Sequence, residues 1–248
     1  MKVIVIGGSG LIGKQLVSVL QQQGHDVIAA SRSTGINSVT GTGLVAAVSG
    51  REVVIDVSNA PSFEDQAVME FFTASSTNAL AAAKRAGVKH YIALSVVGTE
   101  RLQASGYFRA KLVQEKLIAE SGLPYTILRA SQFFEFIAAI AESGNQADSN
   151  SVRMPTALIQ PVASADVVSA LAELLKSAPA NGIIDLAGPD KLQIAQLVSR
   201  YFAAKQDGRQ VIADADATYF GTPLTHDELV PMRPNALLGA SRFSDWLQ

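Results

Sequence analysis

Short apolar segments alternate with longer amphipathic segments through residues 1–142. The short segments are rich in valine and isoleucine and end at glycine or polar residues, as buried strands do. The longer segments repeat apolar residues at the spacing of a helix. Strands that alternate with helices in this way predict βαβ units and a parallel sheet flanked by helices. The expected strands are Lys2–Ile6, Val27–Ala30, Val53–Val57, His90–Leu94 and Tyr125–Leu128.

The helices expected between these strands differ in length. The first follows a cluster of glycines and covers Leu11–Gln23, and the longest covers Glu64–Ala86. A third is expected over Gly106–Glu120. The turn-rich residues 31–43 leave room for one further short strand near Ser38–Thr40.

The polar, turn-forming run Ser143–Ser151 is the first break in this pattern. A chain of 248 residues fits one globular domain, so we expect a single domain over residues 1–248. Its core would be residues 1–142, and residues 151–248 would mainly form a smaller lobe. The shorter elements expected in that part are a helix from Ser164 or Asp166 to Lys176, a strand over Ile183–Leu186 and a helix over Lys191–Ala204.

The composition excludes several classes of function. Apolar residues make up 48% of the chain and charged residues only 17%, so most helices are expected to be packed. The net charge of −2 and the lack of basic runs argue against a nucleic-acid or membrane-surface partner. There is no cysteine, which excludes disulfides and thiolate chemistry. The first apolar run ends in glycines, unlike a signal peptide, so a cytoplasmic protein is expected.

The run Gly7-Gly8-Ser9-Gly10-Leu11-Ile12-Gly13 follows the first strand and opens the first helix. Glycines in that position let backbone N–H groups approach a pyrophosphate, and the helix N-terminus adds partial positive charge. A glycine turn without a ligand is the alternative, and the strand–turn–helix context weighs against it. The sequence therefore predicts a dinucleotide site in a Rossmann-type, doubly wound parallel sheet.

The residues after the second strand indicate which dinucleotide is expected. Sites that select NAD carry a carboxylate at that place, whereas an arginine accommodates the 2′-phosphate of NADP. Here the run from Ala29 to Ser33 has no carboxylate, and Arg32 offers a forked donor that suits a phosphate. An ordinary solvated arginine is the alternative. The sequence favours NADP(H) over NAD(H).

A second constellation lies downstream. Ser95 ends a predicted strand, and twelve residues later Tyr107 and Lys111 share one face of a predicted helix. An ammonium near a phenol lowers its pKa, which would suit Tyr107 to donate a proton to a carbonyl oxygen while a hydride arrives from a nicotinamide. Ser95 can hydrogen-bond the same oxygen. A packed helix tyrosine is the alternative, since Tyr-x-x-x-Lys alone is a common coincidence.

These motifs together resemble the short-chain dehydrogenase/reductase superfamily. The runs Ala86–His90, Ser121–Arg129 and Ser131–Phe136 are similar to its atypical, NmrA-like branch, strongly over residues 1–140 and loosely beyond. The resemblance implies that the pyrophosphate is held by Gly7, Ser9, Gly10, Leu11, Ile12 and Gly13. It further implies Arg32 and Ser33 at the 2′-phosphate, Val57, Ser58, Asn59 and Ala60 beside the adenosine half, Lys111 at the nicotinamide ribose, and Ala130 and Phe133 at the nicotinamide.

Three positions depart from the pattern of that family. Phe72 stands where the long helix of relatives often carries an asparagine that completes a proton relay, so the full relay is in doubt. Ala130 follows Arg129 where many relatives have proline, and Thr42 stands where an aspartate often binds adenine. The last two positions suggest only local changes in cofactor contacts.

Other residues carry weaker signals. Phe133 or Phe134 is expected to wall a substrate pocket, although at least one aromatic of this run should lie in the core. Residues Tyr219–Pro223, after Asp214 and Asp216, fit either a substrate-side loop or surface turns. The three histidines are scattered, so no metal site is expected, and no Gly-x-Ser-x-Gly elbow surrounds a serine.

The sequence thus predicts an NADPH-dependent oxidoreductase that reduces a carbonyl or quinone, with Tyr107 as the acid, Lys111 as ribose anchor and Ser95 as donor to the oxygen. The lobe would face this small-molecule substrate. One alternative is a non-catalytic NADP(H)-binding redox sensor or regulator, because the NmrA-like branch includes such proteins. A second alternative is a nucleotide-sugar epimerase or dehydratase. The sequence leaves homo-oligomerisation open.

Overall fold

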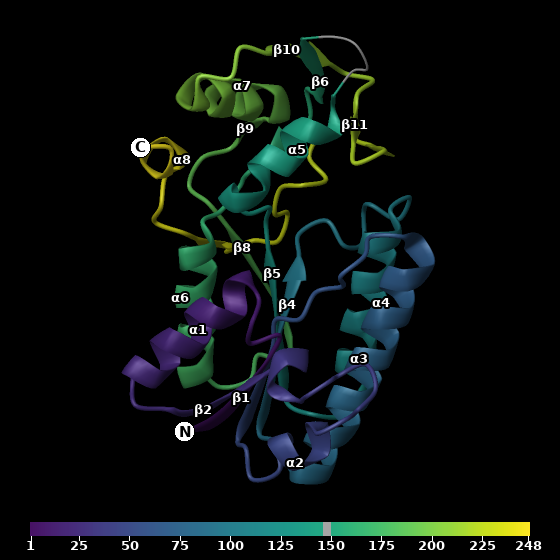
Figure 1. Cartoon of the computed structure of the whole chain (residues 1–248), viewed down its shortest axis with the longest axis vertical. Coiled ribbons are helices and arrows are strands. Elements are labelled where there is room, and N and C mark those ends of the chain that lie inside the picture. Colours follow the sequence, from purple (N-terminus) through teal and green to yellow (C-terminus); the bar gives the residue numbers. More distant parts are fainter. Residues whose placement is uncertain (146–149) are drawn as a thin grey trace.

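Within the residues that the structure describes, 1–145 and 150–248, a parallel sheet of seven strands forms the centre of the protein (Figure 1). In this computed structural model the strand order is β13-β8-β5-β4-β3-β1-β2, and each neighbouring pair is parallel. The Rossmann-type α/β fold expected from the sequence is confirmed. The strands are β1 (Lys2–Ile6), β2 (Asp26–Ala30), β3 (Val53–Asp56), β4 (His90–Val96), β5 (Tyr125–Ala130), β8 (Gly182–Ala187) and β13 (Leu237–Leu238).

The expected strand near Ser38–Thr40 is wrong, because these residues form turns beside the edge strand β2. Their backbone groups bind side chains instead of a neighbouring strand. The side-chain oxygen of Asn37 accepts a hydrogen bond from the N–H of Val39 at 2.9 Å. Asn78 donates to the carbonyl oxygens of Ser38 and Val39 at 2.9 and 2.8 Å. Short polar side chains compete with strand pairing in this way.

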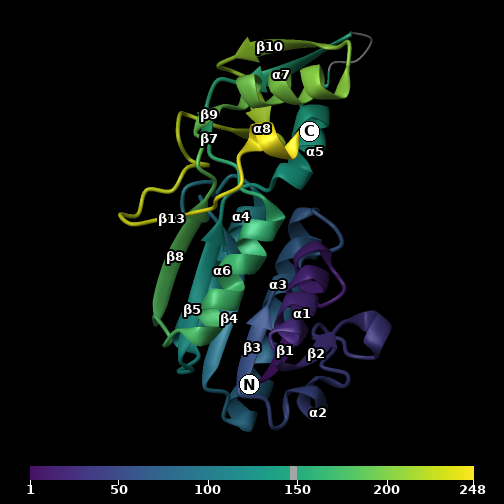
Figure 2. The same cartoon turned by 90° about the vertical axis from the view of Figure 1, so that its left-hand side faces the viewer.

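Helices cover both faces of the sheet (Figures 1 and 2). Alternate residues of β1 point to opposite faces, so Val3 and Val5 pack under α1 and α6, while Ile4 and Ile6 pack with α2, α3 and α4. No helix among residues 1–145 and 150–248 has the length and apolar character to cross a membrane. The helices of these layers are α1 (Leu11–Gln22), α2 (Leu44–Val48), α3 (Asp65–Ala86), α4 (Gly106–Glu120) and α6 (Ser164–Lys176).

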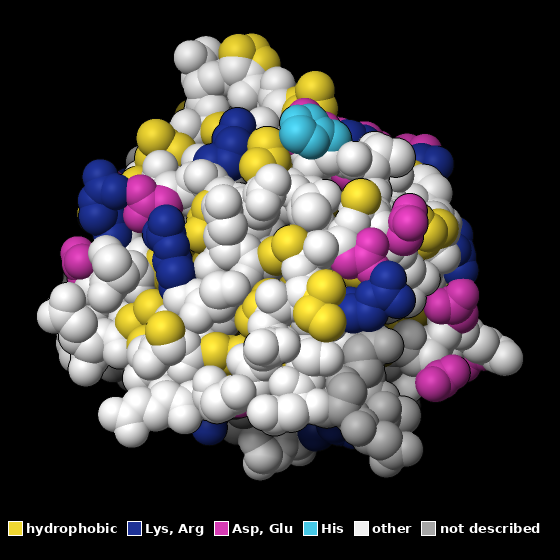
Figure 3. Space-filling model, turned by 90° about the horizontal axis from the view of Figure 1, so that it is seen from above, with side chains coloured by type: hydrophobic (Ala, Val, Ile, Leu, Met, Phe, Trp, Pro, Cys, Tyr) yellow, Lys and Arg dark blue, Asp and Glu magenta, His cyan; other side chains and the backbone are white. Residues whose placement is uncertain are grey.

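A smaller lobe stands beyond the carboxyl ends of the strands, at the top of Figure 1. It has a hydrophobic core of its own, which includes Phe134, Ile159, Leu197 and Phe202. Seen from above, basic and acidic side chains are interspersed on its surface (Figure 3). Its elements are η2 (Phe134–Phe136), α5 (Ile137–Ser143), β6 (Ser151–Pro155), β7 (Leu158–Ile159), β9 (Leu192–Gln193), α7 (Ile194–Lys205), β10 (Gln210–Asp214), β11 (Thr218–Tyr219), β12 (Thr222–Pro223) and α8 (Phe243–Trp246).

The expected boundary, with residues 151–248 mainly in the lobe, is too simple. After residue 151 the chain returns to the sheet twice, since β8 pairs with β5 and β13 pairs with β8. Helix α6 also packs beside α1, because α6 and β8 continue the winding of parallel βαβ units. The lobe itself begins near Phe134, before the polar run Ser143–Ser151. Residues 146–149 of that run lie outside the described part of the chain.

The loop between β1 and α1 is held by contacts that leave no room for side chains. Gly7 has a φ of +82°, and a Cβ there would lie 2.8 Å from the backbone nitrogen of Ser58. A Cβ on Gly13 would overlap the carbonyl oxygen of Gly7. The first turn of α1 therefore packs directly on the backbone of the loop, which in turn packs on the residues after β3.

We expect Gly13→Ala to lower the free energy of unfolding by about 1–3 kcal/mol, because the added methyl overlaps backbone that cannot move aside cheaply. Gly208→Ala is the matched control, since a Cβ at Gly208 meets no atom within 4 Å and its φ lies outside the left-handed region. Urea unfolding of both variants measures the difference. Equal losses would contradict the close packing of this loop.

Candidate functional site

A cleft of about 1430 Å³ runs between the carboxyl ends of the strands and the lobe. The chain passes from β1 to β2 on one side of the sheet and returns to β3 on the other side of β1. Ligands of doubly wound sheets bind at such a switch point, outside the carboxyl ends of the strands. Residues that follow β1, β2, β3, β4 and β5 all line the cleft, and so do residues of α5 and of the β11–β12 hairpin.

The glycine-rich loop forms one end of this cleft. Its backbone turns back on itself, since the N–H of Gly10 donates to the carbonyl oxygen of Gly7 at 2.9 Å, and α1 starts immediately afterwards. Gly13 lies behind the loop as its packing support. The residues of the loop that line the cleft are Gly7, Ser9, Gly10, Leu11 and Ile12.

Arg32 borders the same end of the cleft, on the short 3-10 helix η1 (Arg32–Thr34) that follows β2. It is exposed, and within residues 1–145 and 150–248 its guanidinium has no hydrogen bond or ion pair. Ser33 does not line the cleft, and its hydroxyl shares a hydrogen bond of 2.8 Å with that of Ser31. The structure therefore brings Arg32, but not Ser33, to the cleft wall.

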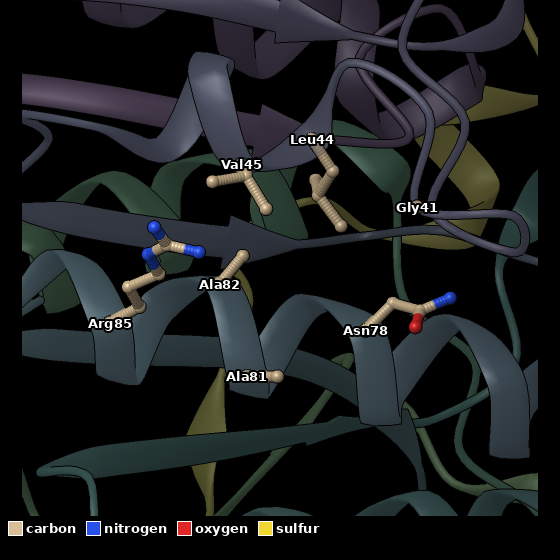
Figure 4. A pocket seen from close by; sticks show the side chains of 7 residues that line it. All are labelled: Gly41, Leu44, Val45, Asn78, Ala81, Ala82 and Arg85. Carbon is tan, nitrogen blue, oxygen red and sulfur yellow. The ribbon is translucent and has the colours of Figure 1, made fainter.

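Turn residues 36–39 line the cleft next to Arg32, and α3 anchors them through Asn78. On its other side Asn78 borders a separate pocket of about 200 Å³ between α2 and α3 (Figure 4). Thr42, where relatives often carry an adenine-binding aspartate, lines neither space. The side chains of the small pocket are Leu44, Val45, Asn78, Ala81, Ala82 and Arg85, with Gly41 at its edge.

The residues after β3 form the opposite wall. Val57, Ser58 and Asn59 line the cleft, whereas Ala60 is buried against α3 and α4. The buried Asp56 holds this loop, because its carboxylate accepts hydrogen bonds from the N–H of Ser58 at 3.0 Å and from its hydroxyl at 2.6 Å. The expectation that Ala60 contacts a ligand is thus not met by its position.

Helix α4 carries a polar stripe that faces the sheet. Tyr107, Lys111 and Glu115 follow one another at intervals of four residues, and the last two are buried. The shared face expected for Tyr107 and Lys111 is confirmed, since α4 covers both residues. Glu115 and Gln114 were missed by the sequence reasoning, although the four-residue spacing continues from Lys111 to Glu115.

The ammonium of Lys111 is fully engaged below the cleft. It donates to the carbonyl oxygen of Leu94 at 2.8 Å and to the side-chain oxygen of Gln114, and it lies 4.5 Å from the centre of the Phe72 ring. Burial lowers the pKa of Lys111 to about 8, against the opposing pull of Asp56 and Glu115. The aromatic ring of Phe72 thus contacts the ammonium at the place expected for a relay asparagine.

Tyr107 lines the cleft, where its ring packs against Phe63, Phe72 and Phe108. Burial raises its pKa to about 12. The lowering of the Tyr107 pKa expected from a nearby ammonium is therefore wrong for this structure, because burial dominates and disfavours the charged phenolate. Tyr107 keeps its proton at neutral pH, and within the described residues its hydroxyl makes no hydrogen bond.

Ser95 lies near the carboxyl end of β4 and lines the cleft, as expected, but its hydroxyl donates its hydrogen to another residue. It donates to a carboxylate oxygen of Glu115 at 2.5 Å. Glu115 is in turn held by two donors of Arg129, at 2.9 and 2.7 Å. Charge-assisted hydrogen bonds of this kind are strong, so the hydrogen of Ser95 is not free for another acceptor.

Aromatic side chains dominate the lobe end of the cleft. Phe133 lines it and stacks on Phe136 at 5.6 Å between ring centres, and Phe136 is also part of the wall. Phe134, which was expected as a possible substrate-wall residue, is 1% exposed in the lobe core, where it contacts Phe243 and Trp246, so it does not line the cleft. Further rings in the wall are Phe63, Phe71, Phe108, Tyr219 and Phe220.

Gln132 lies after β5 between the cleft-lining residues Ser131 and Phe133. It is 7% exposed, and its side-chain nitrogen and oxygen are both buried without a hydrogen-bond partner. A buried side-chain amide without a partner is costly for the fold. Ala130 lines the cleft beside it.

The glycine loop and the cleft at the switch point define a dinucleotide-binding protein of the Rossmann type. A family model described as NAD(P)H-binding matches residues 7–178. The chain belongs to this NAD(P)H-binding family, within the atypical short-chain dehydrogenases/reductases.

Curated relatives resemble only part of the chain. The photosystem II assembly factor Ycf39 of Synechocystis sp. is 27% identical over 149 residues, which cover 54% of this chain and 46% of that protein. Ycf39 of Cyanophora paradoxa is 28% identical over 149 residues, which again cover 54% of this chain and 46% of that protein. The chain thus spans about half the length of these relatives.

Solved structures share the whole fold at low identity. A dTDP-4-dehydrorhamnose reductase from Bacillus anthracis in complex with NADP aligns with a TM-score of 0.74 at 14% identity, covering 99% of this chain and 96% of the other. MoeE5 in complex with UDP-glucuronic acid and NAD aligns with a TM-score of 0.68 at 20% identity, covering 90% and 93%. These matches show that the chain shares the fold of these proteins.

The contact between Lys111 and Phe72 predicts a measurable pKa effect. An aromatic face attracts the cation and favours the protonated amine, so Phe72→Leu should lower the titration midpoint of Lys111 from near 8 by roughly half a pH unit or more. Carbon NMR of labelled lysine, assigned with Lys111→Arg, follows the titration. Phe71→Leu is the control on the same helix, and an equal shift in both variants would rule out the direct contact.

Proposed function

We propose that the protein is an NADPH-dependent reductase of an uncharged carbonyl or quinone. The observation that carries the proposal is the free phenol of Tyr107 in a cleft that joins the glycine loop to an aromatic end wall. Among the described residues, Arg32 and Lys111 are the only cations in the cleft wall, and Lys111 is already engaged.

The residues present fit a dinucleotide. The close packing at Gly7 and Gly13 holds the backbone of the glycine loop in place at the cleft wall, where a pyrophosphate would approach it. Arg32 would take the 2′-phosphate, and its freedom from other partners supports NADP(H) over NAD(H). Gln132 supports a nicotinamide beside Ala130 and Phe133, because a carboxamide offers both a donor and an acceptor to an unpaired side-chain amide.

The reaction needs a hydride and a proton. When bound, NADPH supplies the hydride that reduces the substrate. Tyr107 holds the proton at neutral pH and delivers it to the substrate oxygen, breaking its own O–H bond as the product hydroxyl forms. The phenolate then regains a proton from water in the cleft. Lys111 acts from below, where its positive charge favours the transient phenolate, and stays bound to Leu94 and Gln114.

The wall of the cleft also favours one substrate class over another. A nucleotide sugar carries a pyrophosphate, which proteins usually bind with cations or helix N-termini. The aromatic end carries two carboxylates instead, Glu70 and Asp65, the second paired with Arg109, and Lys111 is the only cation that the described residues place in that wall. Because Lys111 is already engaged by Leu94 and Gln114, this end offers a pyrophosphate no free cation among the described residues, and a neutral planar substrate fits it better than a nucleotide sugar.

A second candidate, a redox sensor that binds NADP(H) without turnover, is favoured by one observation. The hydroxyl of Ser95 donates to Glu115, so the oxygen-binding donor expected of a reductase is committed elsewhere. The curated relatives, which are named as assembly factors, are compatible with this candidate.

Arg32→Ala should erase the preference for NADPH over NADH, because the guanidinium is the group placed to pair with the 2′-phosphate. We expect NADPH affinity to fall about 10-fold or more, as for the loss of a charge-assisted contact, and NADH affinity to stay within about 2-fold. Fluorescence titration measures both dissociation constants. Equal affinities in the unmodified protein would overturn the cofactor assignment.

Tyr107→Phe should reduce turnover of quinones, aldehydes or ketones by at least about 100-fold while NADPH affinity stays nearly unchanged, because only the proton donor is removed. Oxidation of NADPH at 340 nm with a panel of these substrates gives the rate. Tyr201→Phe is the control, since Tyr201 lies on α7 and does not line the cleft. Tight NADPH binding with no turnover in any panel member would favour the sensor.

A further inference from the structure

Tyr219 places a second phenol in the cleft from the lobe side. It ends β11, which pairs with β12 through a two-residue turn of Phe220 and Gly221. Its ring packs in the lobe core cluster that includes Phe108, and Tyr107 packs against the same cluster. Two tyrosines from opposite sides of the cleft, one from α4 and one from the hairpin, thus share one hydrophobic cluster.

The hydroxyl of Tyr219 is free to bind a ligand. Within residues 1–145 and 150–248 it makes no hydrogen bond, and its oxygen is not among the fully buried unpaired atoms. Tyr219 lines the cleft and is 9% exposed. Because its oxygen is not fully buried, the exposed part of the side chain includes the hydroxyl. Burial and the nearby Tyr107 raise its pKa, so it remains a hydrogen-bond donor at neutral pH.

The hairpin holds Tyr219 in a defined orientation. Both turn residues have positive φ, +47° at Phe220 and +76° at Gly221, as a type I′ turn requires. An aromatic residue in the left-handed region is unusual and persists only where its surroundings determine it. The Phe220 ring packs edge-on against Tyr219 at 4.9 Å between centres, and it also lines the cleft.

We propose that Tyr219 donates the second hydrogen bond to the substrate oxygen, in the place expected for Ser95. This inference rests on the proposed reductase function. Ser95 cannot serve that role while it donates to Glu115, and Lys111 is held by Leu94 and Gln114. Tyr107 and Tyr219 then form a pair of phenol donors around one oxygen, with Tyr107 supplying the proton and Tyr219 stabilising the developing negative charge.

The test compares Tyr219→Phe with Tyr201→Phe, which removes the same atom from the same lobe outside the cleft. With NADPH and 1,4-naphthoquinone, we expect the kcat of Tyr219→Phe to fall about 100-fold, as for the loss of one oxyanion donor, while Tyr201→Phe stays near the unmodified protein. The NADPH dissociation constant and the melting temperature should be unchanged in both variants. Unchanged kcat in Tyr219→Phe would overturn the inference and leave the proposed reduction standing.

A second measurement does not depend on turnover. The anion of 4-nitrophenol mimics an oxygen that carries negative charge, and calorimetry with NADP⁺ present gives its affinity. We expect Tyr219→Phe to weaken this affinity about 10-fold and Tyr201→Phe to leave it unchanged. If the unmodified protein reduces no substrate, the proposed function fails, and loss of nitrophenolate affinity in Tyr219→Phe still supports the donor role. Equal affinity in all three proteins overturns it.

Discussion

Lys111 and Glu115 lie buried on one face of α4, against the carboxyl ends of the strands. A buried ion costs several kcal/mol unless a partner compensates it, so each of these groups must be paired within the fold. Arg129 compensates Glu115 with two hydrogen bonds, and Lys111 is satisfied by a carbonyl oxygen, an amide oxygen and an aromatic ring. These pairings fix α4 against β4 and β5. They also engage the hydrogen-bond donors of Lys111 and Ser95 within the protein.

The pairing of these buried groups decides which parts of the site can contact a ligand. The sheet and its loops supply a cradle of backbone and a free guanidinium, while the polar groups beneath the cleft are bound to one another. Gln114 extends this buried network, because its amide also donates to the carboxylate of Asp56 at 3.3 Å, and Asp56 holds the loop at Ser58. In the described part of the cleft wall, the phenols of Tyr107 and Tyr219 are left without a hydrogen bond.

The sequence predicted the parallel sheet, its helices and the glycine loop, because periodicity and glycine spacing are local signals. It failed where tertiary contacts decide. The side chain of Asn78 replaced strand pairing at Ser38–Thr40 from forty residues away, and the choice between Phe133 and Phe134 depended on the lobe core. The Ser95 hydroxyl was expected to donate to a substrate oxygen, because the neighbouring sequence does not show that Glu115 lies beside it in the fold. The sequence also did not predict that α6 and β8 return to the sheet, because that placement depends on contacts with distant parts of the chain.

The two walls of the cleft are held together by the segments that cross between sheet and lobe. The N–H of Ser131 donates to the carbonyl oxygen of Leu186 at 2.9 Å, and the N–H of Val162 donates to that of Gln132 at 2.9 Å. Gln160 adds a side-chain hydrogen bond to the carbonyl oxygen of Gly188 at 2.7 Å. These bonds join residues 131–132, 160–162 and 186–188, where the chain passes between the sheet and the lobe. Tyr107 is held on α4 and Tyr219 at the end of β11, and donors that are positioned by the fold before a ligand binds stabilise developing charge most effectively.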